Sequence, residues 1–282
     1  MDRFRAPNLF GADEKNYGRL LGAVGFATLS GSAALLVGAA FLGAPTPAQA
    51  AYAVNVYDDG VLQGGITTLV SGNSLIFTGT TTHFSITNGS GLSNNPGTQG
   101  GSNLDLSSNE QINTTFGATG GTHTIQIVLS QTGWTAPTGS PLGLSSSAGG
   151  SIAYVAGTNL LATEMVTSTY QGFLDNTNTL FGQPAAGATP LQNVSDSLST
   201  VGTRPLVYSP GTSIALVSGG TPFSLTDVLS FTFALSAGSG QDTANASVST
   251  VADAVPEPAS LTILGGALVG LGWLGRRRRL VA

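Results

Sequence analysis

A strict alternation of apolar and polar side chains is the sequence feature that most constrains how this chain folds. Successive side chains of a β-strand point to opposite faces, so a period of two predicts a strand with one buried face. The pattern is clearest over residues 122–132 and 225–236. The residues expected to face inward there are His123, Ile125, Ile127, Leu129, Leu229, Phe231, Phe233 and Leu235.

Shorter segments with the same alternation recur along the chain and are separated by clusters of Gly, Ser, Thr, Asn and Pro, which favour turns. Further strands are expected at residues 52–57, 74–78, 82–87, 151–156, 163–170, 213–217 and 244–251. Many short strands with frequent turns predict an all-β fold, an antiparallel β-sandwich of the jelly-roll kind, over residues 51–236. A β-solenoid is the alternative, although no fixed-period repeat is visible. Residues 237–254, rich in Ser, Ala, Thr and Asp, are expected to carry the last strand into a flexible stalk before the C-terminal tail.

The charge of the central region excludes several partners. Arg204 is the only basic residue between residues 51 and 255, against ten acidic ones, which gives this region a net charge of −9. Such a region has no electrostatic means of binding nucleic acid or anionic lipid. The chain has no cysteine, so its fold does not depend on disulfides.

The first 50 residues have the three parts of a signal peptide. Arg3, Arg5, Lys15 and Arg19 precede an uncharged apolar segment at residues 20–42. Ala48 and Ala50 then form a small-x-small pattern, which predicts cleavage by signal peptidase after export through the Sec translocon. The mature chain would begin at Ala51. Retention of the apolar segment as a membrane anchor is the alternative, because 23 residues are long enough to span a bilayer.

The last 28 residues contain three consecutive signals. Pro256, Glu257 and Pro258 precede an uncharged segment at residues 259–275, which as a helix would span roughly 25 Å, close to the thickness of a bilayer core. Arg276, Arg277, Arg278 and Arg279 follow it and should stay cytoplasmic. The sequence therefore predicts a C-terminal transmembrane helix with the bulk of the protein outside.

This tail, residues 255–282, resembles the PEP-CTERM sorting signal of exopolysaccharide-producing Gram-negative bacteria, also known as the ice-binding protein C-terminal domain. The resemblance implies that an exosortase in the inner membrane recognises Pro256, Glu257 and Pro258 and cuts near them. The upstream domain would then remain in the cell envelope, on the cell surface or in the extracellular matrix. A plain membrane anchor is the alternative, since a positive-inside span needs no Pro-Glu-Pro.

Catalytic motifs are not evident. His83 and His123 are the only histidines, and in a strand a hydrogen-bonded structural histidine is the simpler interpretation of His123. The sequence has no Gly-x-Ser-x-Gly elbow and no His-Glu-x-x-His pair. A Gly-x-Gly-x-x-Gly match at residues 270–275 lies inside the expected span and forms no dinucleotide site.

Two weaker signals concern ligands. Oxygen ligands for Ca²⁺ are available from Asp58 and Asp59 beside Asn55, and from Asp105 and Glu110 around Asn109, but neither spacing matches a known calcium loop. Flat aromatic side chains suited to stacking on sugars are Trp134, Tyr154, Tyr170 and Tyr208, for which the core is the default place. No cofactor is expected.

Two functions of different classes follow. The first is a non-enzymatic protein of the cell surface or matrix, associated with exopolysaccharide and biofilm. The second is a secreted glycan-binding or glycan-hydrolysing protein, for which a carboxylate pair is required. Glu110 and Glu164 are the candidates for that pair. The absence of a catalytic constellation favours the first.

Overall fold

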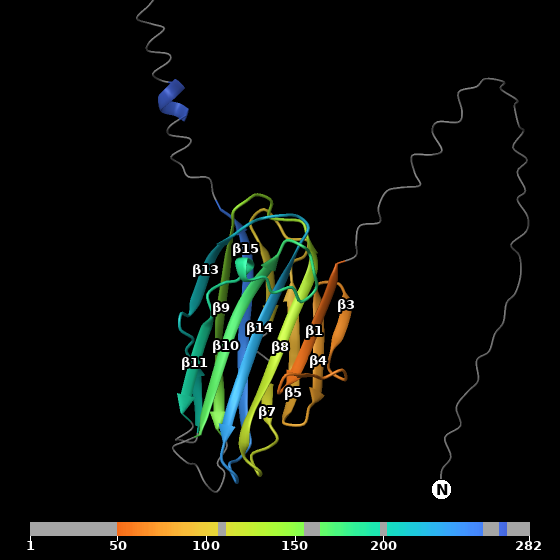
Figure 1. The fold of residues 1–282 in the computed structure, drawn as a ribbon, viewed down its shortest axis with the longest axis vertical. Helices are drawn as coiled ribbons and strands as arrows, with labels where there is room; N and C mark the ends of the chain where they lie inside the picture. Colours follow the sequence, from red (N-terminus) through yellow and green to blue (C-terminus); the bar gives the residue numbers. More distant parts are fainter. Residues whose placement is uncertain (1–49, 107–110, 155–163, 198–201, 256–264, 270–282) are drawn as a thin grey trace, which may run out of the picture. The chain divides into compact units, whose positions relative to one another are not determined.

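The computed structural model describes residues 50–106, 111–154, 164–197, 202–255 and 265–269 (Figure 1). The described residues between 50 and 255 form fifteen strands and one short 3₁₀ helix. The elements in chain order are β1 (Ala51–Asp58), β2 (Val61–Leu62), β3 (Thr68–Ser71), β4 (Ser74–Thr80), β5 (Phe84–Ser93), β6 (Ser102–Leu106), β7 (Gln111–Thr114), β8 (Gly121–Trp134), β9 (Leu142–Tyr154), β10 (Met165–Asp175), η1 (Ala185–Gly187), β11 (Gln192–Ser197), β12 (Gly202–Leu206), β13 (Thr212–Val217), β14 (Phe223–Leu235) and β15 (Asp242–Ala254).

These strands form two antiparallel sheets. The first sheet has the order β11-β10-β14-β8-β1-β2, with β3 also paired to β1. The second has the order β12-β9-β15-β6-β5-β4, with β13 on β9 and with β7 between β15 and β5. The expected all-β, antiparallel fold is confirmed, while the jelly-roll variant stays a prediction. Neighbouring strands are often far apart in sequence, as β1 and β8 are, which is unlike the stacking of a solenoid.

The inward faces of the two sheets share one apolar core. Ile125, Ile127, Phe231 and Phe233, which the alternation placed inside, are all buried. The largest fully buried side chain is Trp134, at the end of β8, whose indole N–H donates a hydrogen bond to the Gln131 carbonyl over 3.0 Å. The two-residue period therefore identified the buried face of β8 and β14 correctly.

The strand expected at residues 244–251 is present, but it is longer than expected and takes up most of the segment 237–254 that was expected to be a flexible stalk. Residues 242–254 form β15, which pairs along its whole length with β9 in the interior of the second sheet. Its inward side chains are small, so the segment resembles a linker in composition, yet Ala244, Ala246 and Val248 are buried. A Cβ at Gly150 would lie 2.2 Å from the Asn245 carbonyl oxygen, so glycine permits the close approach of β9 and β15.

The two ends of the domain lie at the same end of the sandwich. β1 begins and β15 finishes at the same end of the sandwich, the upper end in Figure 1. The β1–β2 turn and the start of β8 lie at the opposite end, because β1 and β8 are antiparallel and Asp58 pairs with Ile125. The chain therefore enters and leaves the sandwich at one end, and the other end is free of both connections.

Outside the sandwich, residues 265–269 are helical. Among the residues that the structure describes, no helix is long and apolar enough to cross a membrane. The expected apolar segment at residues 20–42 lies outside the described residues, as does most of the expected span at residues 259–275.

Candidate functional site

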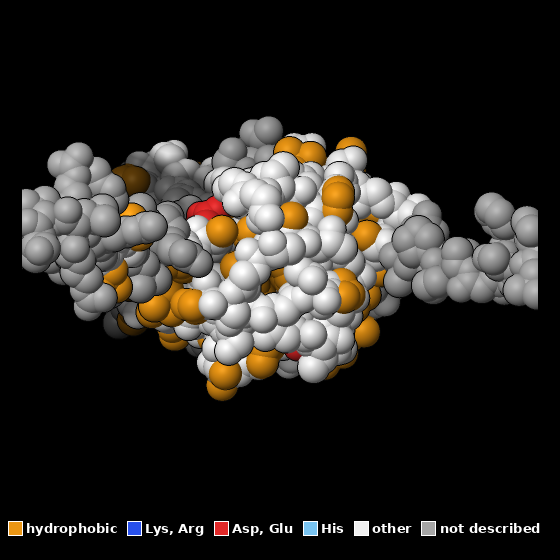
Figure 2. Space-filling model, turned by 90° about the horizontal axis from the view of Figure 1, so that it is seen from above, with side chains coloured by type: hydrophobic (Ala, Val, Ile, Leu, Met, Phe, Trp, Pro, Cys, Tyr) orange, Lys and Arg blue, Asp and Glu red, His pale blue; other side chains and the backbone are white. Residues whose placement is uncertain are grey.

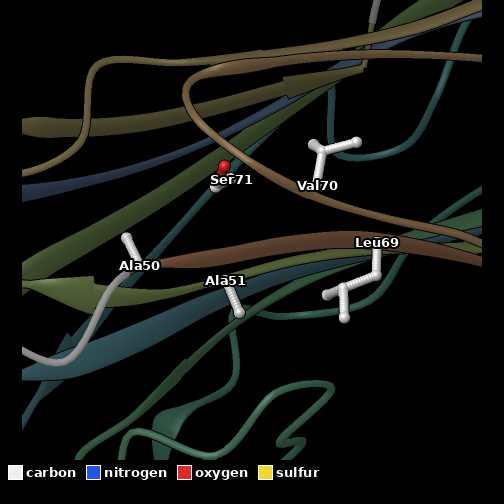
Figure 3. A pocket seen from close by; sticks show the side chains of 5 residues that line it. All are labelled: Ala50, Ala51, Leu69, Val70 and Ser71. Carbon is white, nitrogen blue, oxygen red and sulfur yellow. The ribbon is translucent and has the colours of Figure 1, made fainter.

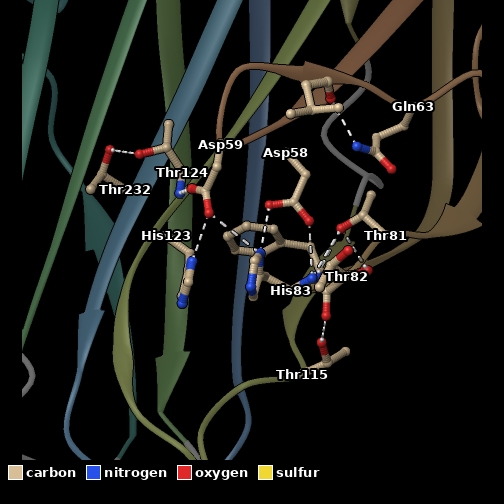
Figure 4. A network of polar contacts seen from close by, with 12 residues as sticks. Asp58, Asp59, Gln63, Thr81, Thr82, His83, Thr115, His123, Thr124 and Thr232 are labelled. Atoms are coloured by element: carbon tan, nitrogen blue, oxygen red, sulfur yellow. Dashed lines mark hydrogen bonds and ion pairs between the residues drawn. The ribbon is translucent and has the colours of Figure 1, made fainter.

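Two histidines and two aspartates meet at the end of the sandwich that is remote from the chain connections (Figure 4). Asp58 ends β1, and Asp59 opens the turn to β2 with a φ of 49°, a left-handed conformation that Asp tolerates well. His123 lies in β8, and its neighbour Thr124 donates its N–H to Asp59 Oδ1 over 2.8 Å. His83 lies in the turn between β4 and β5, so the group joins the two sheets.

In each of the two imidazoles, the ring nitrogen that contacts a carboxylate is Nδ1. His123 Nδ1 lies 2.7 Å from Asp59 Oδ2, and His83 Nδ1 lies 3.5 Å from the same oxygen. His83 Nδ1 also lies 2.9 Å from Asp58 Oδ1, while the His83 backbone N–H donates to Asp58 Oδ2 over 3.0 Å. The Asp58 carboxylate therefore contacts both the backbone N–H and the imidazole of His83. The Asp59 carboxylate lies next to the imidazoles of both histidines.

Aromatic contacts fix the planes of the two imidazoles. The rings of His83 and His123 stack with centroids 3.6 Å apart and an angle of 14° between their planes. The buried Phe116 ring meets both of them edge to face, at 4.5 Å from His123 and 6.0 Å from His83. A Cβ at Gly121 would lie 2.8 Å from His123 Nε2, so glycine leaves room for this ring. The apolar side of the pair is thus closed, and the Nδ1 atoms face the carboxylates.

The charges of this group are concentrated in a small space. The Asp58 side chain is only 2% exposed, whereas that of Asp59 is 40% exposed. Burial raises the pKa of Asp59, but hydrogen bonds from His123 and from the Thr124 N–H outweigh it, so the pKa lies below its ordinary value. Arg204 bonds Asp196, with Nη1 to Oδ1 at 3.2 Å. The carboxylate charges of the group can therefore be balanced by imidazolium or by a bound cation.

The calcium ligands suggested by sequence are only partly brought together. Asp58 and Asp59 are adjacent, but the Asn55 amide is directed to the Tyr57 hydroxyl, at 3.4 Å. Asp105 accepts a hydrogen bond from the Asn103 amide in β6. Glu110 and Asn109 lie outside the described residues.

The aromatic side chains considered for sugar binding are not exposed on the surface. All four aromatic residues considered for sugar stacking are buried, namely Trp134, Tyr154, Tyr170 and Tyr208. Glu164 is also buried, and its Oε1 accepts the Ser236 N–H over 3.0 Å. Its carboxylate therefore binds the backbone just after β14. The pairing of Glu164 with Glu110 is untested, because Glu110 is outside the described residues.

Among the residues of the two processing signals, Pro256, Glu257 and Pro258, Arg276 to Arg279, and Ala48 are outside the described residues. Ala50 and Ala51 are described: Ala51 opens β1 and donates its N–H to Thr132 Oγ1 over 3.0 Å. Together with Leu69, Val70 and Ser71 they line a shallow hollow (Figure 3). These five residues carry no titratable side chain, so the hollow offers no groups for acid–base chemistry.

The pairing of the histidines with Asp58 and Asp59 is the feature that the sequence interpretation missed. The hydrogen bond of His123 agrees with the structural histidine expected there, but its carboxylate partner is distant in sequence. The two histidines are 40 positions apart, and His123 lies in the first sheet while His83 lies in a turn of the second. The usable signal was the combination of an Asp-Asp-Gly turn after the first strand with a histidine at the start of the strand at residues 122–132. Joining the two requires the β1–β8 pairing.

Comparison with known families identifies the C-terminal tail. Residues 254–279 match the family model of the PEP-CTERM protein-sorting motif. No curated protein matches the chain significantly.

Proposed function

We infer that the protein is a non-enzymatic component of the cell surface or extracellular matrix, associated with exopolysaccharide and biofilm. The starting point is its PEP-CTERM sorting motif, which implies recognition by an exosortase and export to the cell envelope or surface. In this scheme the Sec translocon and signal peptidase deliver it across the inner membrane of a Gram-negative cell. An exosortase then processes its tail.

The position of the motif relative to the fold carries this proposal. The matched segment begins at Ala254, which is the last residue of β15. A cut near Pro258 would therefore remove the tail without removing any residue of the sandwich. The same holds at the other end, where β1 begins at Ala51 and cleavage after Ala50 would leave every strand whole. Ala51 and Ala254, the strand residues next to the two expected cuts, both lie at the end of the sandwich where the chain enters and leaves.

The chemistry of the described residues supports a non-enzymatic role. Histidine and aspartate pairs are present, but in the described part of the chain no serine or threonine hydroxyl bonds either imidazole, as a nucleophile activated by its base would. The buried Glu164 is occupied by a backbone N–H. A glycan hydrolase needs two carboxylates that reach one substrate, whereas the Glu164 side chain is buried.

The surface is suited to a matrix of neutral polymer. Figure 2 shows that, on the end of the sandwich seen from above, backbone and uncharged polar side chains, both drawn white, predominate, with scattered apolar side chains and small acidic patches. Hydroxyl and amide groups of Ser, Thr and Asn can exchange hydrogen bonds with sugar hydroxyls, and a charge-poor surface avoids the desolvation of ions. These features support association with polysaccharide through many weak polar contacts.

The sorting step is tested by two substitutions that leave the apolar segment and the arginines unchanged. Each proline fixes its own φ and restricts the residue before it, so Pro-Glu-Pro presents Glu257 in an extended conformation. Glu257→Gln and Pro258→Ala are expected to make full-length precursor accumulate in the inner membrane, as seen by fractionation and immunoblotting. Asp253→Asn is the matched control, because it removes one carboxylate just outside the matched segment, and it should be processed normally. Normal processing of both motif variants would leave only a membrane anchor.

A further inference from the structure

We propose that His83, His123 and Asp59, together with the buried Asp58, form a binding site for one divalent transition-metal ion of the zinc type. The site lies at the end of the sandwich remote from Ala51 and Ala254, and it concerns a property that the sorting motif does not imply.

The positions of the ligand atoms are close to those that such an ion requires. One ligand atom from each of Asp59, His83 and His123 lies within 4.8 Å of the others. Ligands about 2.0–2.2 Å from a tetrahedral ion are separated by roughly 3.4 Å. The distance from His83 Nδ1 to Asp59 Oδ2 is 3.5 Å, and that from His123 Nδ1 to the same oxygen is 2.7 Å. Of these two pairs, the first already has this separation, and the second must lengthen by less than about 1 Å.

The surroundings hold these ligands as outer-sphere contacts do in metal sites. The Thr124 N–H fixes Asp59 through Oδ1, which leaves Oδ2 directed at the rings. Asp58 fixes His83 through its backbone N–H, and Phe116 supports both imidazoles from the apolar side. Asp58 Oδ1, 2.9 Å from His83 Nδ1, is placed to become a fourth ligand or to accept a hydrogen bond from a bound water.

Binding requires one ring to turn. The two imidazole rings are stacked and nearly parallel. The Nδ1 lone pair of an imidazole lies in the plane of its ring, so the lone pairs of two stacked rings do not point at one ion. His123 is the ring expected to move, because its imidazole is held by a single carboxylate contact, while both the ring and the backbone of His83 are bound to Asp58. The side chains of His83 and His123 are 24% and 22% exposed, so an ion can enter from the solvent side. Loss of the ring stacking is therefore an expected sign of binding.

The donor set selects the kind of metal. Two imidazoles with one or two carboxylates suit Zn²⁺, Cu²⁺ or Ni²⁺, while Ca²⁺ prefers six to eight oxygen ligands. Two ionised carboxylates with two neutral imidazoles carry a charge of −2, which one divalent ion neutralises. Arg204, the only basic residue between residues 51 and 255, bonds Asp196 instead. A transition metal therefore satisfies both the charge and the donor atoms of this group.

A bound ion would join the two sheets at this end, since Asp59 and His123 belong to the first sheet and His83 precedes β5 of the second. A ligand that binds only the folded state stabilises it in proportion to the logarithm of its concentration over Kd. At a hundredfold excess over Kd, a rise in Tm of roughly 5–10 °C is expected for a domain of this size.

The test uses the full chain, purified in mild detergent without a polyhistidine tag and freed of metal with a chelator. Because the chain has only two histidines and no cysteine, every imidazole signal belongs to the site and no thiolate competes. Titration with zinc chloride should show one ion per chain by calorimetry, with changed imidazole resonances of both histidines by NMR. Calcium chloride under the same conditions should change neither.

Three variants complete the test. His123→Gln and Asp59→Asn should each lower zinc affinity at least tenfold, whereas Asp196→Asn, which removes a carboxylate elsewhere, should not change it. Circular dichroism of the metal-free variants shows whether they are folded. If a site variant is not folded, the imidazole spectra of the unmodified chain decide the question. Zinc binding that leaves both imidazoles unchanged, binding that is equal in the site variants and the control, or no binding at all would overturn the proposal.

Discussion

A buried carboxyl group between the sheets should make the stability of this protein depend on pH. Asp227 lies in β14 with its side chain fully inside, paired in the first sheet between Gly172 and Leu129. Its Oδ1 accepts a hydrogen bond from the Tyr170 hydroxyl over 2.9 Å, while Oδ2 makes no hydrogen bond to any described residue. Burial raises the pKa of Asp227 to about 7, against the lowering effect of the Thr250 and Tyr170 hydroxyls.

The direction of the effect follows from proton linkage. The pKa of Asp227 in the folded state lies above the value of 3.8 for the unfolded chain, so between these two values the folded state binds more protons. The contribution of this group to stability is therefore complete below about pH 4 and is lost as the pH rises through 7. At 1.36 kcal/mol per pKa unit, the loss is about 4 kcal/mol.

Asp227→Asn should remove this dependence, because the amide cannot ionise and can still accept the Tyr170 hydrogen bond. The assay is urea denaturation of residues 51–255 between pH 4 and pH 8.5, followed by the fluorescence of Trp134. The difference in unfolding free energy between Asp227→Asn and the unmodified protein should move in favour of the variant as the pH rises. Asp196→Asn, at a half-buried ion pair, is the control. A difference for Asp227→Asn that stays constant within about 0.5 kcal/mol over this range would refute the assignment.

Two further predictions concern the core and the last strand. Phe231→Ala should lower the unfolding free energy by roughly 3–5 kcal/mol in the same assay, whereas Ile214→Ala at an exposed position should change it by less than about 0.5 kcal/mol. Val248→Asp places an unpaired charge at a buried position of β15 and should abolish the folded circular dichroism spectrum. A folded Val248→Asp protein would mean that residues 242–254 act as the stalk that their composition suggested.

Side-chain alternation was sufficient to predict the strands whose two faces differ strongly. In β8 and β14, large apolar residues such as Ile127 and Phe231 alternate with polar ones, so the buried phase was visible without the structure. In the middle of β9 and along most of β15 the inward residues are small. Residues 145–150 of β9 read Ser-Ser-Ser-Ala-Gly-Gly, a composition that local rules assign to turns, and the strand forms because β15 packs closely on it.

The histidine and aspartate group could not be predicted from local sequence for a different reason. Asp59, His83 and His123 belong to segments separated by 24 and 40 residues, and each is unremarkable in its own segment. They meet because β1 pairs with β8, and because the β4–β5 turn lies at the same end of the sandwich. Such long-range strand pairing is set by the whole sheet and not by any one segment.

The most direct test of the account is the intact mass of the protein recovered from the cell envelope or the medium of its native host. Export with processing at both ends predicts a chain that begins at Ala51 and ends near Pro258, with every strand from β1 to β15 retained. Recovery of a chain that still contains Met1 and Ala282 would contradict it.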